Sequence, residues 1–357
     1  MSRKESHKAL TEKEGVDSPE ITHATSIAKI KERRKEAIDV PALTKALLEG
    51  HIAALSRAIT LIESTQKKHR KIAKQLIESC LPYANTSIRI GITGVPGVGK
   101  STFIEAYGNY LTQQQNKVAV LAVDPSSSVS KGSILGDKTR MEELVKNPMV
   151  FIRPSASGES LGGVARKTRE AILLCEAAGY PIILIETVGV GQSETAVHSM
   201  VDFFLLLKLA GAGDELQGIK RGIMEMADTI VINKADGENI KAAKAAQLEF
   251  KRALHLYREK EFGWKPKVLV CSALNNEGIP AIHETITSYI AQAKESGYFE
   301  KKRFEQNKHW LMQTIDDRLK SKFYNRKTVQ RALQEQLKLL ETGKTTPFAA
   351  AEYLLGL

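Results

Sequence analysis

The sequence has few of the features that mark secreted or membrane-spanning proteins. Its 357 residues include only three cysteines, Cys80, Cys175 and Cys271, which lie far apart in the chain. An odd number of widely separated cysteines argues against a disulfide framework and is typical of reduced thiols in a cytosolic protein. The longest apolar runs, such as 181–185 and 203–207, are much shorter than the roughly 20 residues that a membrane-spanning helix needs. We therefore expect a cytoplasmic protein with no membrane association.

The amino-terminal segment also lacks the composition of a targeting signal. Its first twenty residues contain five acidic residues and no apolar block. Secretory signals need an apolar stretch and transit peptides are poor in acids, so neither is expected. Residues 1–39 are polar, with nearly balanced charges, and we expect a disordered or loosely helical arm.

Charge of one sign is not gathered into long blocks. The net charge is +11, but acidic and basic residues are mixed, and the densest basic clusters lie at 67–71 and 301–303. No nucleic-acid-binding motif accompanies either cluster. We interpret them as solvated helix faces or as a surface for an acidic protein, and we expect no nucleic-acid partner.

The spacing of apolar residues divides the rest of the chain into three parts. Residues 40–83 carry apolar residues at helical spacing, which predicts a small helical domain. In 84–296, short β-branched runs alternate with longer amphipathic stretches, which predicts a mainly parallel sheet with helices on both faces. Residues 297–357 contain two helical apolar stripes and no expected strand. The expected strands are 88–93, 118–123, 150–153, 182–186, 202–207, 229–233 and 268–271.

A glycine-rich turn follows the first expected strand and makes the α/β fold class that of a P-loop NTPase. The sequence from Gly94 to Ser101 is Gly-Val-Pro-Gly-Val-Gly-Lys-Ser, in which backbone N–H groups and the next helix dipole would bind phosphates. Lys100 would contact the β- and γ-phosphates, and the Ser101 hydroxyl would ligate Mg²⁺. The predicted contacts are Gly94, Val95, Pro96, Gly97, Val98, Gly99, Lys100, Ser101 and Thr102.

A second motif predicts which base is bound. Asn233, Lys234 and Asp236 follow the expected strand 229–233. The Asp236 carboxylate can accept both N–H donors on the N1 and N2 edge of guanine, and a site built for those hydrogen bonds discriminates against adenine. Asn233 would tie this loop to the phosphate loop, and the stem of Lys234 would cover the purine face. Backbone contacts to the guanine carbonyl are expected from Ser272, Ala273 and Leu274.

Acidic residues at or after strand ends predict a metal site. Mg²⁺ prefers oxygen ligands, often through its remaining waters. Glu186 ends an expected strand and lies close to Gly189, whose backbone N–H could contact a γ-phosphate. A helix cap or a surface charge is the alternative role for any of these carboxylates. The expected metal ligands are Ser101, Asp124, Asp137 and Glu186.

Longer strings of the sequence resemble one family. They lie at 54–60, 124–127, 132–141, 186–194 and 213–221. With these strings the chain, from about Pro41 to its end, resembles the chaperone GTPases that serve cobalamin-dependent acyl-CoA mutases. The group includes the methylmalonyl-CoA mutase-associated G protein, and some relatives carry the older name of arginine/ornithine transport system kinase.

The resemblance implies an activity and two partners. The activity is Mg²⁺-dependent hydrolysis of GTP to GDP and phosphate, coupled to loading of adenosylcobalamin on a mutase and to ejection of damaged cofactor. The first partner is the mutase, and the second is another copy of the chain, joined through the C-terminal helices. Lys100 and Glu186 are the expected catalytic residues within the chain. Lys220, beside Arg221, is a cation that a docked mutase could reposition; a solvated basic helix face is the alternative.

Other classes fit parts of the sequence. A nucleotide-dependent kinase or ATPase of arginine/ornithine transport is the main alternative, but Asp236 and the lack of an acceptor-substrate site argue against it. A signal-recognition GTPase would need a methionine-rich domain, and the seven methionines are scattered. The eight histidines are also scattered, which argues against the metallochaperone GTPases that carry His-rich tracts.

Overall fold

A computed structural model describes residues 38–123, 141–154, 161–187, 193–211, 221–257 and 259–357. Residues 40–357 form one compact unit around a seven-stranded sheet of order β3-β2-β4-β1-β5-β6-β7. Every strand pair in this sheet is parallel, as the α/β prediction requires. The strands are β1 Ile88–Gly94, β2 Val118–Val123, β3 Val150–Arg153, β4 Ile182–Thr187, β5 Phe203–Leu209, β6 Thr229–Asn233 and β7 Lys267–Val270.

The register brings the carboxyl ends of the central strands to one edge of the sheet. Ile92 of β1 pairs with Glu186 of β4, and Gly94 pairs with Leu207 of β5. One strand further, Leu209 pairs with Asn233 at the end of β6. In open parallel sheets, ligands bind in the crevice outside the carboxyl ends of the strands. This edge is therefore where the predicted site should lie.

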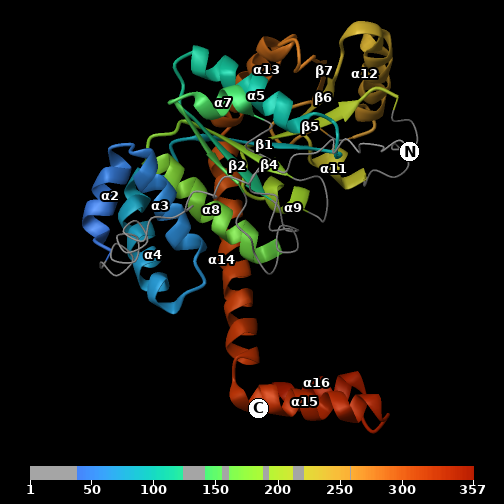
Figure 1. The fold of residues 1–357 in the computed structure, drawn as a ribbon. Helices are drawn as coiled ribbons and strands as arrows, with labels where there is room; N and C mark the ends of the chain where they lie inside the picture. The colour runs from blue at the N-terminus through green and yellow to red at the C-terminus, as the bar shows by residue number, and fades with distance from the viewer. Residues whose placement is uncertain (1–37, 124–140, 155–160, 188–192, 212–220, 258) are drawn as a thin grey trace, which may run out of the picture. The chain divides into compact units, whose positions relative to one another are not determined.

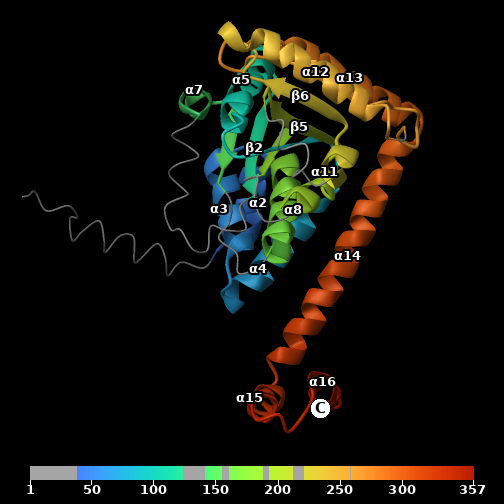
Figure 2. The ribbon, with the colours of Figure 1, turned by 90° about the vertical axis from the view of Figure 1, so that its right-hand side faces the viewer.

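Helices cover both faces of the sheet (Figures 1 and 2). Leu205 and Leu207 of β5 pack in one core with α5 and α13, whereas Leu206 packs in a second core with α11 and α12. This alternation follows from the two-residue period of a strand. Over β1, β2 and β4, that second face is covered by α8 and α9. The helices are α5 Lys100–Gln113, α7 Glu142–Lys146, α8 Leu161–Ala177, α9 Ser193–His198, α11 Arg221–Met226, α12 Ile240–Leu254 and α13 Ile279–Glu295.

The helices expected in 40–83 are present and pack on α8. Their apolar positions Leu47, Leu55 and Ile59 are fully buried, which is why a helical spacing was readable in the sequence. They are α2 Val40–Leu48, α3 Ile52–Glu63, α4 Lys67–Cys80 and the short 3₁₀ turn η1 Leu81–Tyr83. The three cysteines are buried free thiols.

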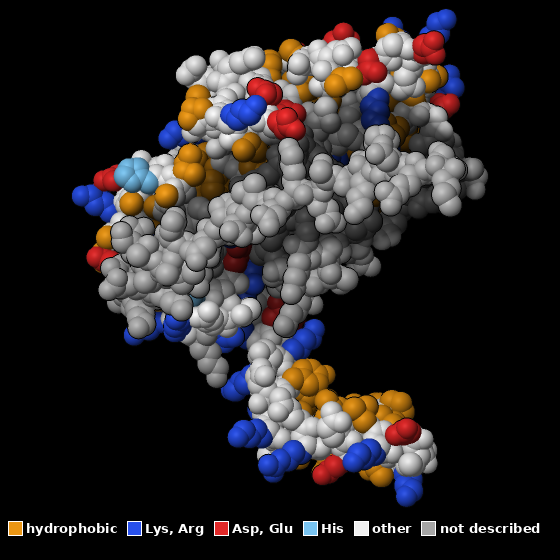
Figure 3. Space-filling view, viewed as in Figure 1, with side chains coloured by type: hydrophobic (Ala, Val, Ile, Leu, Met, Phe, Trp, Pro, Cys, Tyr) orange, Lys and Arg blue, Asp and Glu red, His pale blue; other side chains and the backbone are white. Residues whose placement is uncertain are grey.

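Three helices follow Gly297, where the sequence predicted a strandless region. They are α14 Tyr298–Tyr324, α15 Lys327–Glu341 and α16 Pro347–Leu355. After the first turns of α14 the apolar side chains are mostly exposed, and Figure 3 shows hydrophobic side chains gathered along these C-terminal helices. None of the described helices combines the length and the apolar character needed to cross a bilayer.

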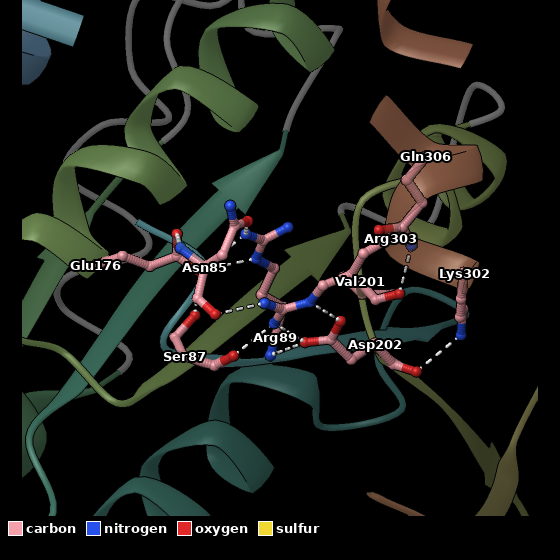
Figure 4. A network of polar contacts seen from close by, with 9 residues as sticks. All are labelled: Asn85, Ser87, Arg89, Glu176, Val201, Asp202, Lys302, Arg303 and Gln306. Carbon is pink, nitrogen blue, oxygen red and sulfur yellow. Dashed lines mark hydrogen bonds and ion pairs between the residues drawn. The ribbon is translucent and has the colours of Figure 1, made fainter. Parts of the chain in front are cut away.

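The first turns of α14 are anchored to the amino ends of β1 and β5 by a buried ion pair (Figure 4). Arg303 donates to Asp202 from Nε at 2.9 Å and from Nη2 at 2.7 Å, and it also donates to the carbonyl oxygens of Asn85 and Ser87. Lys302 donates to the Asp202 carbonyl oxygen at 2.7 Å. The interpretation of 301–303 as a solvated basic face is therefore wrong for Lys302 and Arg303, which hold the helix to the sheet.

Candidate nucleotide-binding site

The predicted phosphate loop connects β1 to α5 at the carboxyl edge of the sheet. Two positions of the loop require glycine for two reasons. Their backbone has a positive φ, which favours glycine, and other atoms lie too close to leave room for a Cβ. A Cβ on Gly94 would lie 2.7 Å from the Leu207 carbonyl oxygen, and one on Gly99 would lie 2.8 Å from Asn233 Nδ2. The loop comprises Gly94, Val95, Pro96, Gly97, Val98 and Gly99, and Lys100, Ser101 and Thr102 form the first turn of α5.

The side chain of Lys100 folds back over this loop. Its Nζ donates to the carbonyl oxygens of Gly94 at 2.8 Å and Val95 at 3.2 Å, and the residue is only 8% exposed. A cation is thus held at the open end of a helix whose N–H groups and dipole attract anions. The arrangement suits the phosphate groups of a nucleotide.

Two of the four predicted metal ligands lie in contact. Ser101 Oγ donates to Glu186 Oε1 at 3.2 Å, and Glu186 is buried at the end of β4. A hydroxyl and a carboxylate oxygen are the donor types that Mg²⁺ takes in proteins, so the described part of the predicted set fits this ion. Asp124 and Asp137 lie outside the described residues, as do Gly189 and Lys220.

Asn233 joins the segments that surround the predicted base. Its Nδ2 donates to the Val98 carbonyl oxygen at 2.9 Å, and its Oδ1 accepts from the Ala273 backbone N–H at 3.1 Å. The thiol of Cys271 donates to the same oxygen, with Sγ and Oδ1 3.4 Å apart. Burial, together with the charge of Asp236, raises the pKa of Cys271 to about 12, so the thiol keeps its proton at neutral pH. The phosphate loop and the loops after β6 and β7 are therefore linked through one amide.

The carboxylate of Asp236 is held by a residue that the sequence analysis treated only as a backbone contact. Ser272 Oγ donates to Asp236 Oδ2 at 2.5 Å and accepts from the backbone N–H of Asn275 at 3.2 Å. Ser272 is 1% exposed, and an antiparallel bridge to Glu277 closes its loop. The signal for this role was a small hydroxyl residue at the end of a buried strand, but sequence spacing alone could not bring it to Asp236.

The remaining predicted base-binding residues belong to the two loops that this contact joins. Lys234 is exposed and has a left-handed backbone with a φ of 58°. Ala273 is buried, whereas the side chain of Leu274 is 76% exposed. A backbone contact from this loop does not need the Leu274 side chain, and the exposed stem of Lys234 is accessible to a planar base.

A hydroxyl pair beneath the phosphate loop was also missed. Thr187 Oγ1 donates to Thr93 Oγ1 at 2.8 Å, and both side chains are buried. Thr93 immediately precedes Gly94, and Thr187 immediately follows Glu186, so the pair links the strand that carries the phosphate loop to the strand that carries the predicted metal ligand. Threonine in a strand is common, and nothing in the sequence pattern distinguishes these two.

Comparisons with known proteins agree with one another. The family model described as methylmalonyl Co-A mutase-associated GTPase MeaB matches residues 55–328. A probable GTPase of Mycobacterium tuberculosis is 48% identical over 316 residues, which cover 88% of this chain and 94% of that protein. GTPase ArgK of Escherichia coli is 44% identical, with coverage of 85% and 92%. The mitochondrial methylmalonic aciduria type A homolog of Mus musculus is 45% identical, with coverage of 90% and 80%. A crystal structure described as an LAO/AO transport system kinase superposes with a TM-score of 0.72 at 36% identity, covering 90% of this chain and 99% of that one.

Proposed function

Because the chain belongs to the MeaB family of GTPases, we propose that it couples its nucleotide state to adenosylcobalamin loading on a cobalamin-dependent acyl-CoA mutase, such as methylmalonyl-CoA mutase. The activity itself, hydrolysis of GTP to GDP and phosphate, follows from the family. The observation that carries the proposal is the match of residues 55–328, which include the whole nucleotide site, to a family described as mutase-associated. By this coupling the protein would protect or reactivate the mutase.

In the proposed mechanism, the chain positions the nucleotide and stabilises charge. Asp236, held by Ser272, accepts the two N–H donors of guanine, and the phosphate loop with Lys100 stabilises the phosphates. Ser101 and Glu186 would hold Mg²⁺, together with Asp124 and Asp137. When bound, Mg²⁺ supplies positive charge to the β- and γ-phosphate oxygens. Phosphoryl transfer needs mainly such positioning and charge stabilisation, so these groups suffice for slow hydrolysis.

The docked mutase is proposed to raise the rate of hydrolysis by repositioning groups of this chain around the phosphates. Lys220, next to Arg221, offers a cation that a docked partner could bring to the phosphates. Gly189 would offer a backbone N–H to the γ-phosphate from the segment after β4. In other GTPases a cation delivered by a partner raises the rate by about 10³–10⁵, and we expect a smaller effect here.

A homodimer joined through the C-terminal helices completes the proposal. Along α14 the side chains of Leu311 and Leu319 are each 60% exposed, and on α16 those of Phe348 and Leu355 are 77% and 68% exposed. Figure 3 shows hydrophobic side chains gathered on this part of the chain, and exposed apolar patches mark protein interfaces. With its reduced thiols, such a protein would act in the cytoplasm.

The alternative role in arginine/ornithine transport has less support. One solved relative is described as a transport system kinase, and that description belongs to that protein. The relatives from Mycobacterium tuberculosis and Escherichia coli are described as GTPases, and Asp236 with Ser272 forms an acceptor suited to guanine. We therefore favour the mutase-associated role.

Nucleotide-dependent retention of a mutase tests the proposal. The immobilised full-length protein would be loaded with GDP, with a non-hydrolysable GTP analogue or with no nucleotide, and then exposed to purified methylmalonyl-CoA mutase. We expect retention that changes with the nucleotide, and loss of that change in Asp236→Ala, whose binding of guanine nucleotide is impaired. Failure to retain the mutase in any nucleotide state would refute the proposed partner.

A further inference from the structure

A cavity of about 260 Å³ opens at the end of the sheet opposite the nucleotide site. It is formed by the segment before β1, the start of β1, α8, the residues after α9, and α14. Arg89 of β1 lines the cavity, whereas Gly94 at the other end of the strand begins the phosphate loop. At about 3.3 Å per residue, roughly 16 Å of strand separates the two sites.

The carboxylate in the cavity wall already accepts hydrogen bonds from several donors of the protein. Among the described residues that line the cavity, Glu176 is the one acid. Its carboxylate accepts from the Asn85 backbone N–H at 2.7 Å, from Ser87 Oγ at 2.6 Å, and from Nε and Nη2 of Arg89 at 3.0 and 2.9 Å (Figure 4). The charges of Glu176 and Arg89 therefore cancel within the wall.

Arg169 on α8 brings a second positive charge to this wall. It is 7% exposed, and its Nη2 and Nη1 donate to two neutral groups, Ser199 Oγ at 2.6 Å and Gln313 Oε1 at 3.3 Å. Its Nε has no hydrogen-bond partner among the described residues, and no described acid forms an ion pair with it. Burial lowers the pKa of Arg169 to about 10, so it remains a cation at neutral pH. A buried cation without an opposite charge is destabilising, and an anion in the cavity would remove this cost.

Two further polar groups of the same wall lack partners in the described part of the chain. They are the Nε1–H donor of Trp310 and the Oε1 acceptor of Gln306, both on α14. Gln306 is oriented by its own Nε2, which donates to the Val201 carbonyl oxygen at 2.8 Å (Figure 4). Buried polar groups in native proteins are normally satisfied, so the two unpartnered donors, on Arg169 and Trp310, point to a bound acceptor. Ordered water could satisfy Trp310 and Gln306, but it would not neutralise Arg169.

We propose that this cavity binds a small carboxylate with a short apolar body, whose carboxylate is recognised by Arg169 and Trp310. One uncompensated positive charge matches a monoanion, and a guanidinium with an indole N–H matches a carboxylate. The remaining wall includes Ile172, Leu173 and Met200, which suit a short hydrocarbon group. The volume lies just below the range of about 300–1,000 Å³ that drug-sized ligands occupy, which restricts the ligand to a small molecule.

Titration with butanoate and with its neutral isostere butanamide tests the proposal. The chain has two tryptophans, and Trp310 lines the cavity, so its fluorescence should report binding to the full-length protein. We expect a saturable change with butanoate, at a Kd about tenfold or more below that of butanamide, because a charge-assisted hydrogen bond is lost in the amide. In Trp310→Phe the fluorescence change should disappear, while calorimetry should find butanoate binding weakened about three- to tenfold.

Variants of the cation separate recognition from folding. Arg169→Gln should abolish the preference for butanoate and Arg169→Lys should keep part of it, with GTP binding retained in both as the check on folding. Lys308→Gln removes a charge from an exposed position of α14 outside the cavity and should change nothing.

Three results would overturn the proposal. The first is equal or absent binding of butanoate and butanamide, and the second is unchanged butanoate binding in Arg169→Gln. The third is that the unmodified protein does not bind butanoate while Arg169→Gln changes the oligomeric state. The negative charge beside Arg169 would then come from a second copy of the chain.

Discussion

Asp236 is the side chain on which the proposed choice of base depends, and Ser272 holds its carboxylate at 2.5 Å. We expect Asp236→Ala to lose about 1–3 kcal/mol of GTP binding free energy, because the buried donors of guanine lose their acceptor. Asp236→Asn should shift preference towards a xanthine nucleotide, whose C2 oxygen needs a donor. Glu238→Ala, an exposed acid in the same loop, is the control. Calorimetry in which the unmodified protein binds ATP as tightly as GTP would contradict the assignment.

His198 at the end of α9 should make stability depend on pH. Burial, helped by the charge of Lys302, lowers the pKa of His198 from 6.5 to about 4. The unfolded chain then binds the proton more readily, so stability is fully present above pH 6.5 and is lost as the pH falls towards 4. Between pH 7 and pH 5 this amounts to about 2 kcal/mol. Urea unfolding at both pH values should show this part of the loss removed in His198→Leu; equal losses in both proteins would exclude His198 as the cause.

At the residue scale, the sequence predicts which side chains could bind a nucleotide better than it predicts which side chains contact one another. Lys100, Ser101 and Asp236 stand in patterns whose spacing follows from the chemistry of phosphate and guanine, so they could be proposed without a structure. The Ser272 hydroxyl and the Thr93–Thr187 pair could not, because each depends on strands that are distant in sequence being neighbours in the sheet.

At the scale of elements, α14 is fixed to the sheet by the buried pair of Arg303 and Asp202. Arg303→Met should destabilise the protein by about 3–5 kcal/mol, because it leaves the Asp202 carboxylate buried without its cation. Lys301, two residues earlier, pairs with Glu261 where both side chains are more than half exposed. Lys301→Met should therefore cost no more than about 1 kcal/mol. Similar midpoints of denaturation for the two variants would show that the buried pair does not anchor the helix.

The same anchor decides where the C-terminal helices can be removed. A chain ending at Gly297 would lose Arg303, so the cut belongs after Asn325, beyond α14. We expect the full-length protein to be a dimer, and the chain without 326–357 to dimerise more weakly while binding GTP unchanged. Leu319→Lys, at an exposed position of α14, should weaken the dimer in the full-length chain. Light scattering that finds the full-length chain monomeric at micromolar concentration would refute the dimer.

Element boundaries were predictable where an apolar run ends at polar residues, as in β2, β3 and β6. For β5 the predicted range of 202–207 was displaced. The strand runs from Phe203 to Leu209 through Lys208, and just before it the Asp202 carboxylate accepts from the Arg89 backbone N–H and from Arg303. A lysine in a sequence indicates a surface, but Lys208 is 1% exposed and lies 5.8 Å from the centre of the Phe250 ring. The packing of α12 on the sheet places the Phe250 ring beside it.

At the scale of the whole molecule, the sequence predicted a parallel α/β fold between two helical parts because the apolar periods differ so clearly along the chain. It could not predict that Arg169, Gln306 and Trp310 meet at one cavity, since α8 and α14 are distant in sequence. The division at 40–83, 84–296 and 297–357 remains a proposal.

GTP turnover measured with and without a cobalamin-dependent mutase shows whether the mutase controls the GTPase. The measurement would use the full-length protein, Lys220→Ala as the coupling variant and Asp236→Ala as a variant impaired in guanine binding. We predict slow turnover alone, acceleration by the mutase, and a smaller acceleration in Lys220→Ala. Equal acceleration of the wild type and Lys220→Ala would exclude Lys220 as the coupling residue. Turnover that no cobalamin-dependent mutase alters would contradict the proposed control of the GTPase by a mutase.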